Sequence, residues 1–138
     1  MAHPSHRQRH VLIVDDDGDC SEAFQVLVQG WGCDAYVAKN PDDALALIGK
    51  RHPDAILVDL GLPWIEQGLG LVRQVRELPG GEEFLILAVT GHGRAEDRRR
   101  AIGAGCDFFF VKPPDLDEVH EALLTVDAHR EWARRRRG

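Results

Sequence analysis

Six polar residues that could take part in chemistry follow short apolar runs of the sequence: Asp15, Asp16, Asp17, Asp59, Thr90 and Lys112. Two carboxylates about 4 Å apart repel by roughly 4 kcal/mol at an effective dielectric constant near 20, so acids gathered in one site need a cation to stay ionised together. Oxygen ligands without His or Cys favour Mg²⁺, which keeps several waters and commonly takes one or two carboxylates plus phosphate oxygens. These residue types therefore predict a Mg²⁺ site that handles phosphate.

The same residues can be given separate tasks. Lys112 would bring a positive charge to one phosphate oxygen, and the Thr90 hydroxyl would donate a hydrogen bond to another. Asp59 is the expected nucleophile because it stands alone at the end of its run, whereas the cluster of Asp15 and Asp16 suits metal binding. Asp17 is expected to be a helix N-cap or a solvated loop end, and it is not assigned to the site.

Hydrophobic periodicity predicts the elements that must position these side chains. Five short β-rich runs alternate with five segments of helical period, which indicates an α/β fold with a parallel sheet covered on both faces. The predicted strands are 10–14, 34–37, 55–58, 84–89 and 108–111, and the predicted helices are 19–29, 41–49, 68–77, 94–103 and one from residue 116 onward. The candidate residues stand at the carboxyl ends of strands, where open α/β sheets bind ligands, so we expect one shared pocket.

Local signals support the predicted helix boundaries. Asn40 followed by Pro41 is typical of a helix start, and Asp115 with Glu118 forms a capping-box pattern. Gly30 and Gly32 are expected to end the first helix.

Length and charge limit the possible functions. A chain of 138 residues is long enough for one domain and too short for two. Its formal charge of −6 combines basic ends with an acidic middle, which suggests a cation site and argues against nucleic-acid binding. No apolar run predicts a signal peptide or membrane span, and the three cysteines have no CxxC spacing, so we expect a cytoplasmic protein without disulfides or zinc.

Four motifs resemble, in order and spacing, those of response-regulator receiver domains. They are Val11-Leu-Ile-Val-Asp-Asp-Asp17, Asp54-Ala-Ile-Leu-Val-Asp-Leu-Gly-Leu-Pro63, Leu87-Ala-Val-Thr-Gly91 and Phe110-Val-Lys-Pro113. The resemblance covers about residues 10–126, and the stretches from Asp59 to Pro63 and from Gly91 to Lys112 are most similar to receivers attached to hybrid histidine kinases. It implies a flavodoxin-like, doubly wound five-stranded parallel sheet with strand order 2-1-3-4-5 and five helices. It also implies that Asp59 takes a phosphoryl group from the phosphohistidine of a sensor histidine kinase or histidine phosphotransfer protein.

The resemblance further implies how the metal is held. Asp16 and Asp59 would bind Mg²⁺ directly together with the Gly61 carbonyl, and Asp15 would act mainly through water. The chain would be a phosphoacceptor that catalyses its own phosphotransfer and dephosphorylation, not an enzyme with a separate substrate.

The output is expected to be a changed protein surface. By resemblance, Thr90 and Lys112 would respond to the new phosphate charge, and Phe109 occupies an aromatic switch position that changes rotamer. The signal would pass to a separate protein partner, to self-association or along a phosphorelay, with no membrane partner.

Three segments depart from the receiver pattern or flank it. Residues 10–128 are expected to form the receiver domain, preceded by a disordered basic tail at 1–9. Residues 129–138 are expected to be a basic, Arg-rich end of the last helix or a tail, where Trp132 could be exposed. The loop from Pro63 to Gly68 is one residue longer than the pattern and has Glu66 in place of its usual acid, so its shape is not predicted.

The peptide bond between Lys112 and Pro113 is predicted to be cis. Only Pro113, Pro114 and Asp115 remain to turn the chain from the last strand into a helix at Leu116, and a cis bond shortens this path. Similar receiver domains generally have a cis bond there.

Other classes of protein share parts of this pattern. An aspartate-nucleophile phosphatase would need a second acid two residues after the nucleophile, where this chain has Gly61. A flavodoxin-like cofactor binder would need a Gly- and Ser/Thr-rich phosphate loop after the first strand. The remaining alternative is a pseudo-receiver that docks a partner without phosphorylation, although such a module would normally have lost one of the acids, Thr90 or Lys112, and all are present here.

Overall fold

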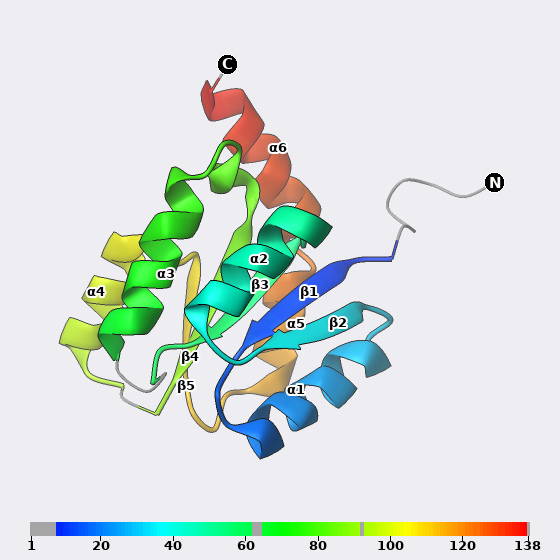
Figure 1. The fold of residues 1–138 in the computed structure, drawn as a ribbon, viewed down its shortest axis with the longest axis vertical. Coiled ribbons are helices and arrows are strands. Elements are labelled where there is room, and N and C mark those ends of the chain that lie inside the picture. The colour runs from blue at the N-terminus through cyan, green and yellow to red at the C-terminus, as the bar shows by residue number, and fades with distance from the viewer. Residues whose placement is uncertain (1–7, 62–64, 92, 138) are drawn as a thin grey trace.

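Five parallel strands form one sheet in the order β2-β1-β3-β4-β5 in the computed structural model, which describes residues 8–61, 65–91 and 93–137 (Figure 1). The strands are β1 (His10–Val14), β2 (Asp34–Ala38), β3 (Ala55–Asp59), β4 (Leu85–Thr90) and β5 (Phe108–Val111). The strand order changes direction between β1 and β3, because β2 lies on one side of β1 and the later strands lie on the other. The predicted α/β class, parallel pairing and strand order are confirmed.

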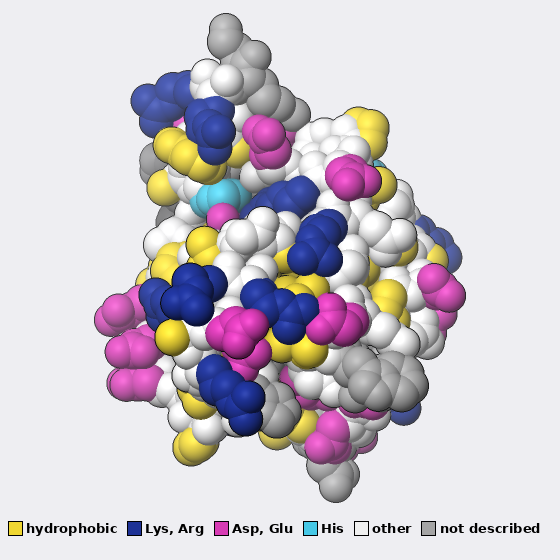
Figure 2. Space-filling view, turned by 90° about the vertical axis from the view of Figure 1, so that its left-hand side faces the viewer, with side chains coloured by type: hydrophobic (Ala, Val, Ile, Leu, Met, Phe, Trp, Pro, Cys, Tyr) yellow, Lys and Arg dark blue, Asp and Glu magenta, His cyan; other side chains and the backbone are white. Residues whose placement is uncertain are grey.

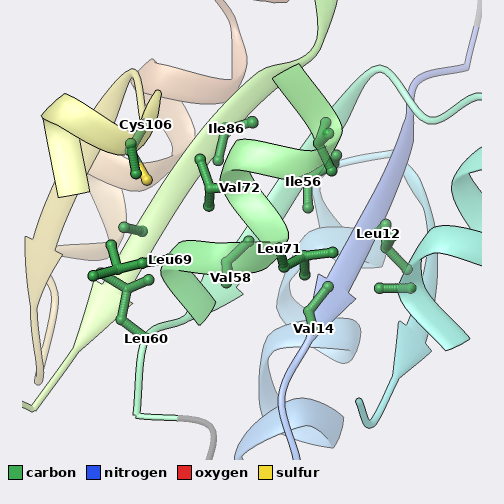
Figure 3. Packing of buried hydrophobic residues seen from close by; sticks show 14 of the residues in the cluster. Leu12, Val14, Ile56, Val58, Leu60, Leu69, Leu71, Val72, Ile86 and Cys106 are labelled. Atoms are coloured by element: carbon green, nitrogen blue, oxygen red, sulfur yellow. The ribbon is translucent and has the colours of Figure 1, made fainter. Parts of the chain in front are cut away.

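Helices cover both faces of this sheet (Figure 1). The described helices are α1 (Gly18–Gly30), α2 (Pro41–Arg51), α3 (Ile65–Glu77), the 3₁₀ helix η2 (Gly81–Glu83), α4 (Ala95–Ala104), α5 (Leu116–Leu123) and α6 (Val126–Arg137). One hydrophobic cluster joins the sheet to α2, α3 and α4, and the other joins it to α1, α5 and α6. Figure 3 shows Leu69, Leu71 and Val72 of α3 packed over the strands in the first cluster.

Alternation along each strand supplies both clusters. In β1, Leu12 and Val14 belong to the cluster with α2 and α3, whereas Val11 and Ile13 belong to the opposite cluster. All four side chains are at most 1% exposed, and each fully buried side chain of this size contributes about 1.5–3 kcal/mol. The sheet is therefore a rigid support for the side chains at the carboxyl ends of its strands.

The predicted helix caps are present. Asn40 Oδ1 accepts a hydrogen bond from the Asp43 N–H at 2.8 Å, with Pro41 as the first helical residue. Asp115 Oδ1 accepts from the N–H groups of Asp117 at 3.0 Å and Glu118 at 3.3 Å. In both cases the side chain satisfies a donor that the first helical turn leaves without a partner.

The start of α3 differs from the prediction. The helix begins at Ile65, three residues before the predicted start at Gly68. Ile65 packs against the hydrophobic cluster and Glu66 lies in the first turn, where a negative charge favours the helix. The segment taken as a loop is thus partly helical, and its residues 62–64 lie outside the described residues.

The last predicted helix is divided in two, so the described chain has six α-helices where five were expected. The break falls at Leu124 and Thr125, where the Thr125 N–H donates to the Ala122 carbonyl three residues earlier. The Thr125 hydroxyl donates to the same carbonyl at 2.7 Å, which tightens this turn and competes with regular helical bonding. The chain then continues in α6 to Arg137. Within the described ranges, no helix is long and apolar enough to span a bilayer.

Candidate functional site

Asp59 and Lys112 meet at the carboxyl edge of the sheet. Asp59 is the last residue of β3, and its side chain is 13% exposed. The Lys112 ammonium donates a hydrogen bond to Asp59 Oδ2 at 2.7 Å, and the Gly61 N–H donates to Oδ1 at 2.8 Å. Burial alone would lower the pKa of Lys112, but the hydrogen bond to Asp59 and its charge together raise it. Asp59 is thus a carboxylate held in place by donors at both oxygens.

Asp15 lies beside this pair and is 2% exposed. Burial raises the pKa of the Asp15 carboxyl; the Asp17 N–H, which donates to its Oδ1 at 3.0 Å, opposes the rise, and the negative charge of Asp59 adds to it. Asp15, Asp59 and Lys112 line a cavity of about 10 Å³. The structure therefore brings together two of the predicted acids and the predicted lysine, with the acids in electrostatic conflict.

The acids have the chemistry of a magnesium site, although they do not form a closed cluster. Asp16 is exposed, and no three His, Cys, Asp or Glu side chains of the described residues lie close enough together to hold a metal ion. The set still fits Mg²⁺, which needs only one or two carboxylates because it retains waters. Gly61 leaves room beside the Asp59 carboxylate, since a Cβ at position 61 would lie 3.2 Å from Asp59 Oδ1.

Thr90 lies on β4, which is next to β3, and Phe109 lies on β5, the strand beyond β4. Thr90 ends β4 and is fully buried, and its carbonyl accepts a hydrogen bond from the Lys112 N–H at 2.7 Å. Phe109 is half-buried and packs with the cluster formed by α3 and α4, whereas Phe108 and Phe110 pack on the opposite face of the sheet. Phe109 therefore lies on the α4 side of β5, where a change of its rotamer would alter the packing against that helix.

The chain turns sharply after Lys112. The Lys112-Pro113 peptide bond is cis, which confirms the prediction from the short connection to α5. The turn leaves the Lys112 side chain directed to Asp59 while Asp115 caps the next helix.

Two side chains of α1 belong to the site and were not predicted from the sequence. Cys20 forms a hydrogen bond with Asp15, and the pKa of its thiol is raised to about 11, first by burial and second by this contact. Phe24 follows one helical turn later and lines the cavity that Asp59 and Lys112 share. Their four-residue spacing was the available signal, because residues i and i+4 share a helix face.

Asp17 has the capping role expected of it. Its Oδ1 accepts a hydrogen bond from the Cys20 N–H at 3.3 Å in the first turn of α1. The cap holds α1 directly after the acids, which fixes the position of the Cys20 side chain relative to Asp15.

The unusual Glu66 does not lie in the acidic group. Its carboxylate accepts two hydrogen bonds from Arg100 Nη2, at 2.5 and 2.6 Å, and this ion pair ties α3 to α4. Glu66 therefore takes a structural role in this conformation, unlike the acid that the family pattern has nearby.

The Arg-rich segment from residue 129 to 137 is helical, and two of its arginines form ion pairs with acids at the amino edge of the sheet. Arg130 Nη2 lies 2.5 Å from Asp54 Oδ1, and Arg134 Nε lies 3.0 Å from Glu83 Oε1. Of the expected N-terminal tail, residues 1–7 lie outside the described residues, whereas Arg9 pairs with Asp127 at 3.4 Å. Figure 2 shows basic side chains gathered at the end of the molecule that α6 forms.

Trp132 lies on the outer side of the same helix. Its side chain is 49% exposed, and the Arg136 guanidinium lies 4.7 Å from the centre of its ring. This exposure agrees with the expectation from the sequence that Trp132 could be exposed.

Comparison with known proteins gives one consistent result. Residues 11–124 match the family model described as "Response regulator receiver domain". The chain is 34% identical over 112 residues to an uncharacterized 14.6 kDa protein of Leptolyngbya boryana, with 81% of this chain and 85% of that protein covered. It is 31% identical to the response regulator MprA of Mycobacterium sp. (strain KMS), covering 79% of this chain but only 46% of MprA.

Solved structures show the same similarity. A putative response regulator from Chloroflexus aurantiacus superposes with a TM-score of 0.81 at 30% identity, over 88% of this chain and 99% of the other. The chemotaxis response regulator CheY4 of Vibrio cholerae superposes with a TM-score of 0.75 at 26% identity, over 86% of this chain and 98% of the other.

Proposed function

Because the chain belongs to the response-regulator receiver domain family, we propose that it is a phosphorylation-controlled signalling module in which Asp59 accepts a phosphoryl group. The observation that supports this proposal most directly is the Lys112 ammonium 2.7 Å from Asp59 Oδ2. A partly buried lysine in contact with a carboxylate can neutralise charge on a phosphoryl group that arrives at that carboxylate. If the ion pair of Asp59 and Lys112 only stabilised the fold, the negative charge of Asp15 beside it would be unfavourable and would have no use.

The proposed reaction is transfer from a phosphohistidine. An Asp59 oxygen attacks phosphorus, and the new P–O bond forms as the P–N bond breaks. The imidazole nitrogen keeps the bonding electron pair and takes a proton from solvent. The donor would be a sensor histidine kinase or a histidine phosphotransfer protein, and the return of Asp59 to its free form would require water to attack the same phosphorus.

Mg²⁺ would be held by Asp16 and Asp59 with the Gly61 carbonyl, and Asp15 would act mainly through water. When bound, the ion would supply positive charge that reduces repulsion between the carboxylates and the incoming phosphoryl group. Asp15 and Lys112 have separate tasks in this proposal. Asp15 supplies negative charge for the cation, and Lys112 leaves Asp59 Oδ2 to bind a phosphoryl oxygen.

The new phosphate would change the surface between α4 and β5. Phosphorylation adds a charge of about −1.5 to −2 and three acceptor oxygens, which would draw in the Thr90 hydroxyl and the Lys112 ammonium. Phe109 packs on the α4 side of β5, so movement at Thr90 would be transmitted to that helix and to a downstream partner.

The test is intact-mass analysis after incubation with Mg²⁺ and acetyl phosphate. We expect one phosphoryl addition that is lost in alkali or hydroxylamine, as an acyl phosphate should be. The Asp59→Asn variant keeps the shape of the side chain without the nucleophile and should show no addition. Addition that persists in this variant would refute Asp59 as the acceptor. A folded wild-type protein that takes up no phosphate would instead support a docking module.

A further inference from the structure

α5 and α6 together form a rod with a row of exposed residues along it. Only Leu124 and Thr125 separate the two helices, and the Leu124 and His129 N–H groups still donate to carbonyls four residues earlier. The row consists of Glu121, Leu124, Ala128, Trp132 and Arg135. Successive members are three, four, four and three residues apart, a spacing that keeps side chains on one face of a helix.

This row faces away from the body of the protein. Val119, Leu123, Val126 and Ala133 of the same rod are at most 3% exposed and form the side that packs on the domain. In contrast, Leu124 is 55% exposed and Trp132 is 49% exposed, so the outer side carries apolar area that a partner could cover. The rod therefore has a buried side, which fixes it, and an outer side with two large apolar residues.

We propose that this α5–α6 face, defined as Glu121, Leu124, Ala128, Trp132 and Arg135, binds the same face of a second copy of the chain in an antiparallel, two-fold dimer. Its spacing is symmetrical about Ala128. A copy rotated by a two-fold axis at Ala128 places Glu121 opposite Arg135 and Leu124 opposite Trp132. Ala128 then meets itself, and its small side chain lets the helices approach closely.

Charge selects this orientation over a parallel one. Glu121 and Arg135 are 14 residues apart, or about 21 Å along a helix, which exceeds the Debye length of about 8 Å at physiological salt. The two ends therefore do not neutralise each other within one chain. A parallel pair would put Glu121 against Glu121 and Arg135 against Arg135, whereas the antiparallel pair matches opposite charges twice.

The surface is a property of this chain more than of its family. The family match ends at residue 124, so Ala128, Trp132 and Arg135 lie beyond it. Arg135 has an intrachain contact with Glu131 at 3.6 Å, but both side chains are at least 70% exposed, and such pairs contribute little. That contact leaves Arg135 available to a partner.

Sedimentation equilibrium of the unphosphorylated protein tests the dimer. The average mass should rise from 15.4 kDa toward twice that value as concentration increases from micromolar to near-millimolar, and more weakly at high salt. Leu124→Glu should abolish the rise, whereas Ile102→Glu, at an α4 side chain that is 45% exposed, should not. A wild-type protein that stays monomeric throughout, or equal behaviour of the two variants, would overturn the proposal.

A charge-reversal cycle tests the antiparallel register. Glu121→Arg and Arg135→Glu should each weaken dimerisation by about tenfold, because each dimer holds the pair twice, and the double reversal should restore it. Glu77→Arg and Arg98→Glu make the same charge changes at exposed sites on α3 and α4 and should have little effect. A double reversal that remains as weak as the single variants would refute this pairing.

Discussion

Replacing Arg130 by alanine should destabilise the protein far more than replacing Arg134, although both arginines lie on α6 and both contact an acid. The Asp54 side chain is 3% exposed, and Arg130 Nη2 lies 2.5 Å from its Oδ1. Asp54 Oδ2 accepts a hydrogen bond from the His10 N–H at 2.8 Å. Asp54 thus joins the start of β1 to the C-terminal helix, and loss of Arg130 leaves its charge buried.

The expected magnitude follows from the burial of each pair. Removing one partner of a buried ion pair costs about 3–5 kcal/mol, and the 22% exposure of Arg130 lets water replace part of the lost interaction, so we expect about 2–4 kcal/mol. The Arg134 side chain is 63% exposed and its partner Glu83 is 21% exposed. An exposed pair of this kind contributes about 0–1 kcal/mol, and this is the loss expected for Arg134→Ala.

Urea unfolding followed by circular dichroism measures both losses. A domain of this size is expected to unfold in one step, so the midpoints report stability if the slopes agree. The pair Asp54→Asn with Arg130→Met keeps an oxygen for the His10 N–H and removes both charges, and it should be more stable than Arg130→Ala alone. Equal losses for Arg130→Ala and Arg134→Ala would refute the reasoning from burial.

Four further outcomes are expected. Because burial raises the folded-state pKa of Asp15, metal-free stability should fall as pH rises above its ordinary value of 3.8 through the raised value. Asp15→Asn should remove this fall and raise the urea midpoint at pH 7 but not at pH 3. Asp16→Asn should lower Mg²⁺ affinity measured by calorimetry, and equal affinity would refute its role as a ligand. The thiol of Cys106, whose pKa burial raises to about 12, should react with a disulfide reagent at pH 8 far more slowly in the folded than in the unfolded protein. Gly81→Ala should be strongly destabilising in thermal unfolding, because its Cβ would lie 2.1 Å from the Val75 carbonyl oxygen, whereas Gly70→Ala in α3 has open space and should stabilise by about 0.5–1 kcal/mol.

The sequence was sufficient wherever the determining interactions are local. Apolar runs located the strands, and short-range capping chemistry located the starts of α2 and α5 at Asn40 and Asp115. The convergence of Asp15, Asp59 and Lys112 could also be predicted, because parallel strands bring their carboxyl ends to one edge of the sheet. The cis bond between Lys112 and Pro113 was predicted from the short connection to α5 together with the resemblance to receiver domains.

Contacts between distant segments could not be predicted in the same way. The early start of α3 depends on Ile65 finding the core and Glu66 finding Arg100, which lies 34 residues later. Asp54 and Arg130 pair although they are 76 positions apart, and no local sequence pattern at either residue predicts this contact. From the sequence, the Arg-rich segment could be described only as basic, because its partners Asp54 and Glu83 come close to it only in the folded chain.

The two edges of the sheet use charge in opposite ways. At the amino edge, Asp54 has a cation and a backbone donor at its two oxygens, so that its burial is compensated. At the carboxyl edge, Asp15 is buried beside Asp59, and burial together with that like charge opposes its ionisation. Two acids in conflict do not stabilise a fold, and Lys112 contacts only Asp59 directly, so a further positive charge beside Asp15 would make this arrangement more favourable. The paired edge therefore stabilises the domain, and the conflicting edge is the one at which we propose that a cation binds and phosphate is exchanged.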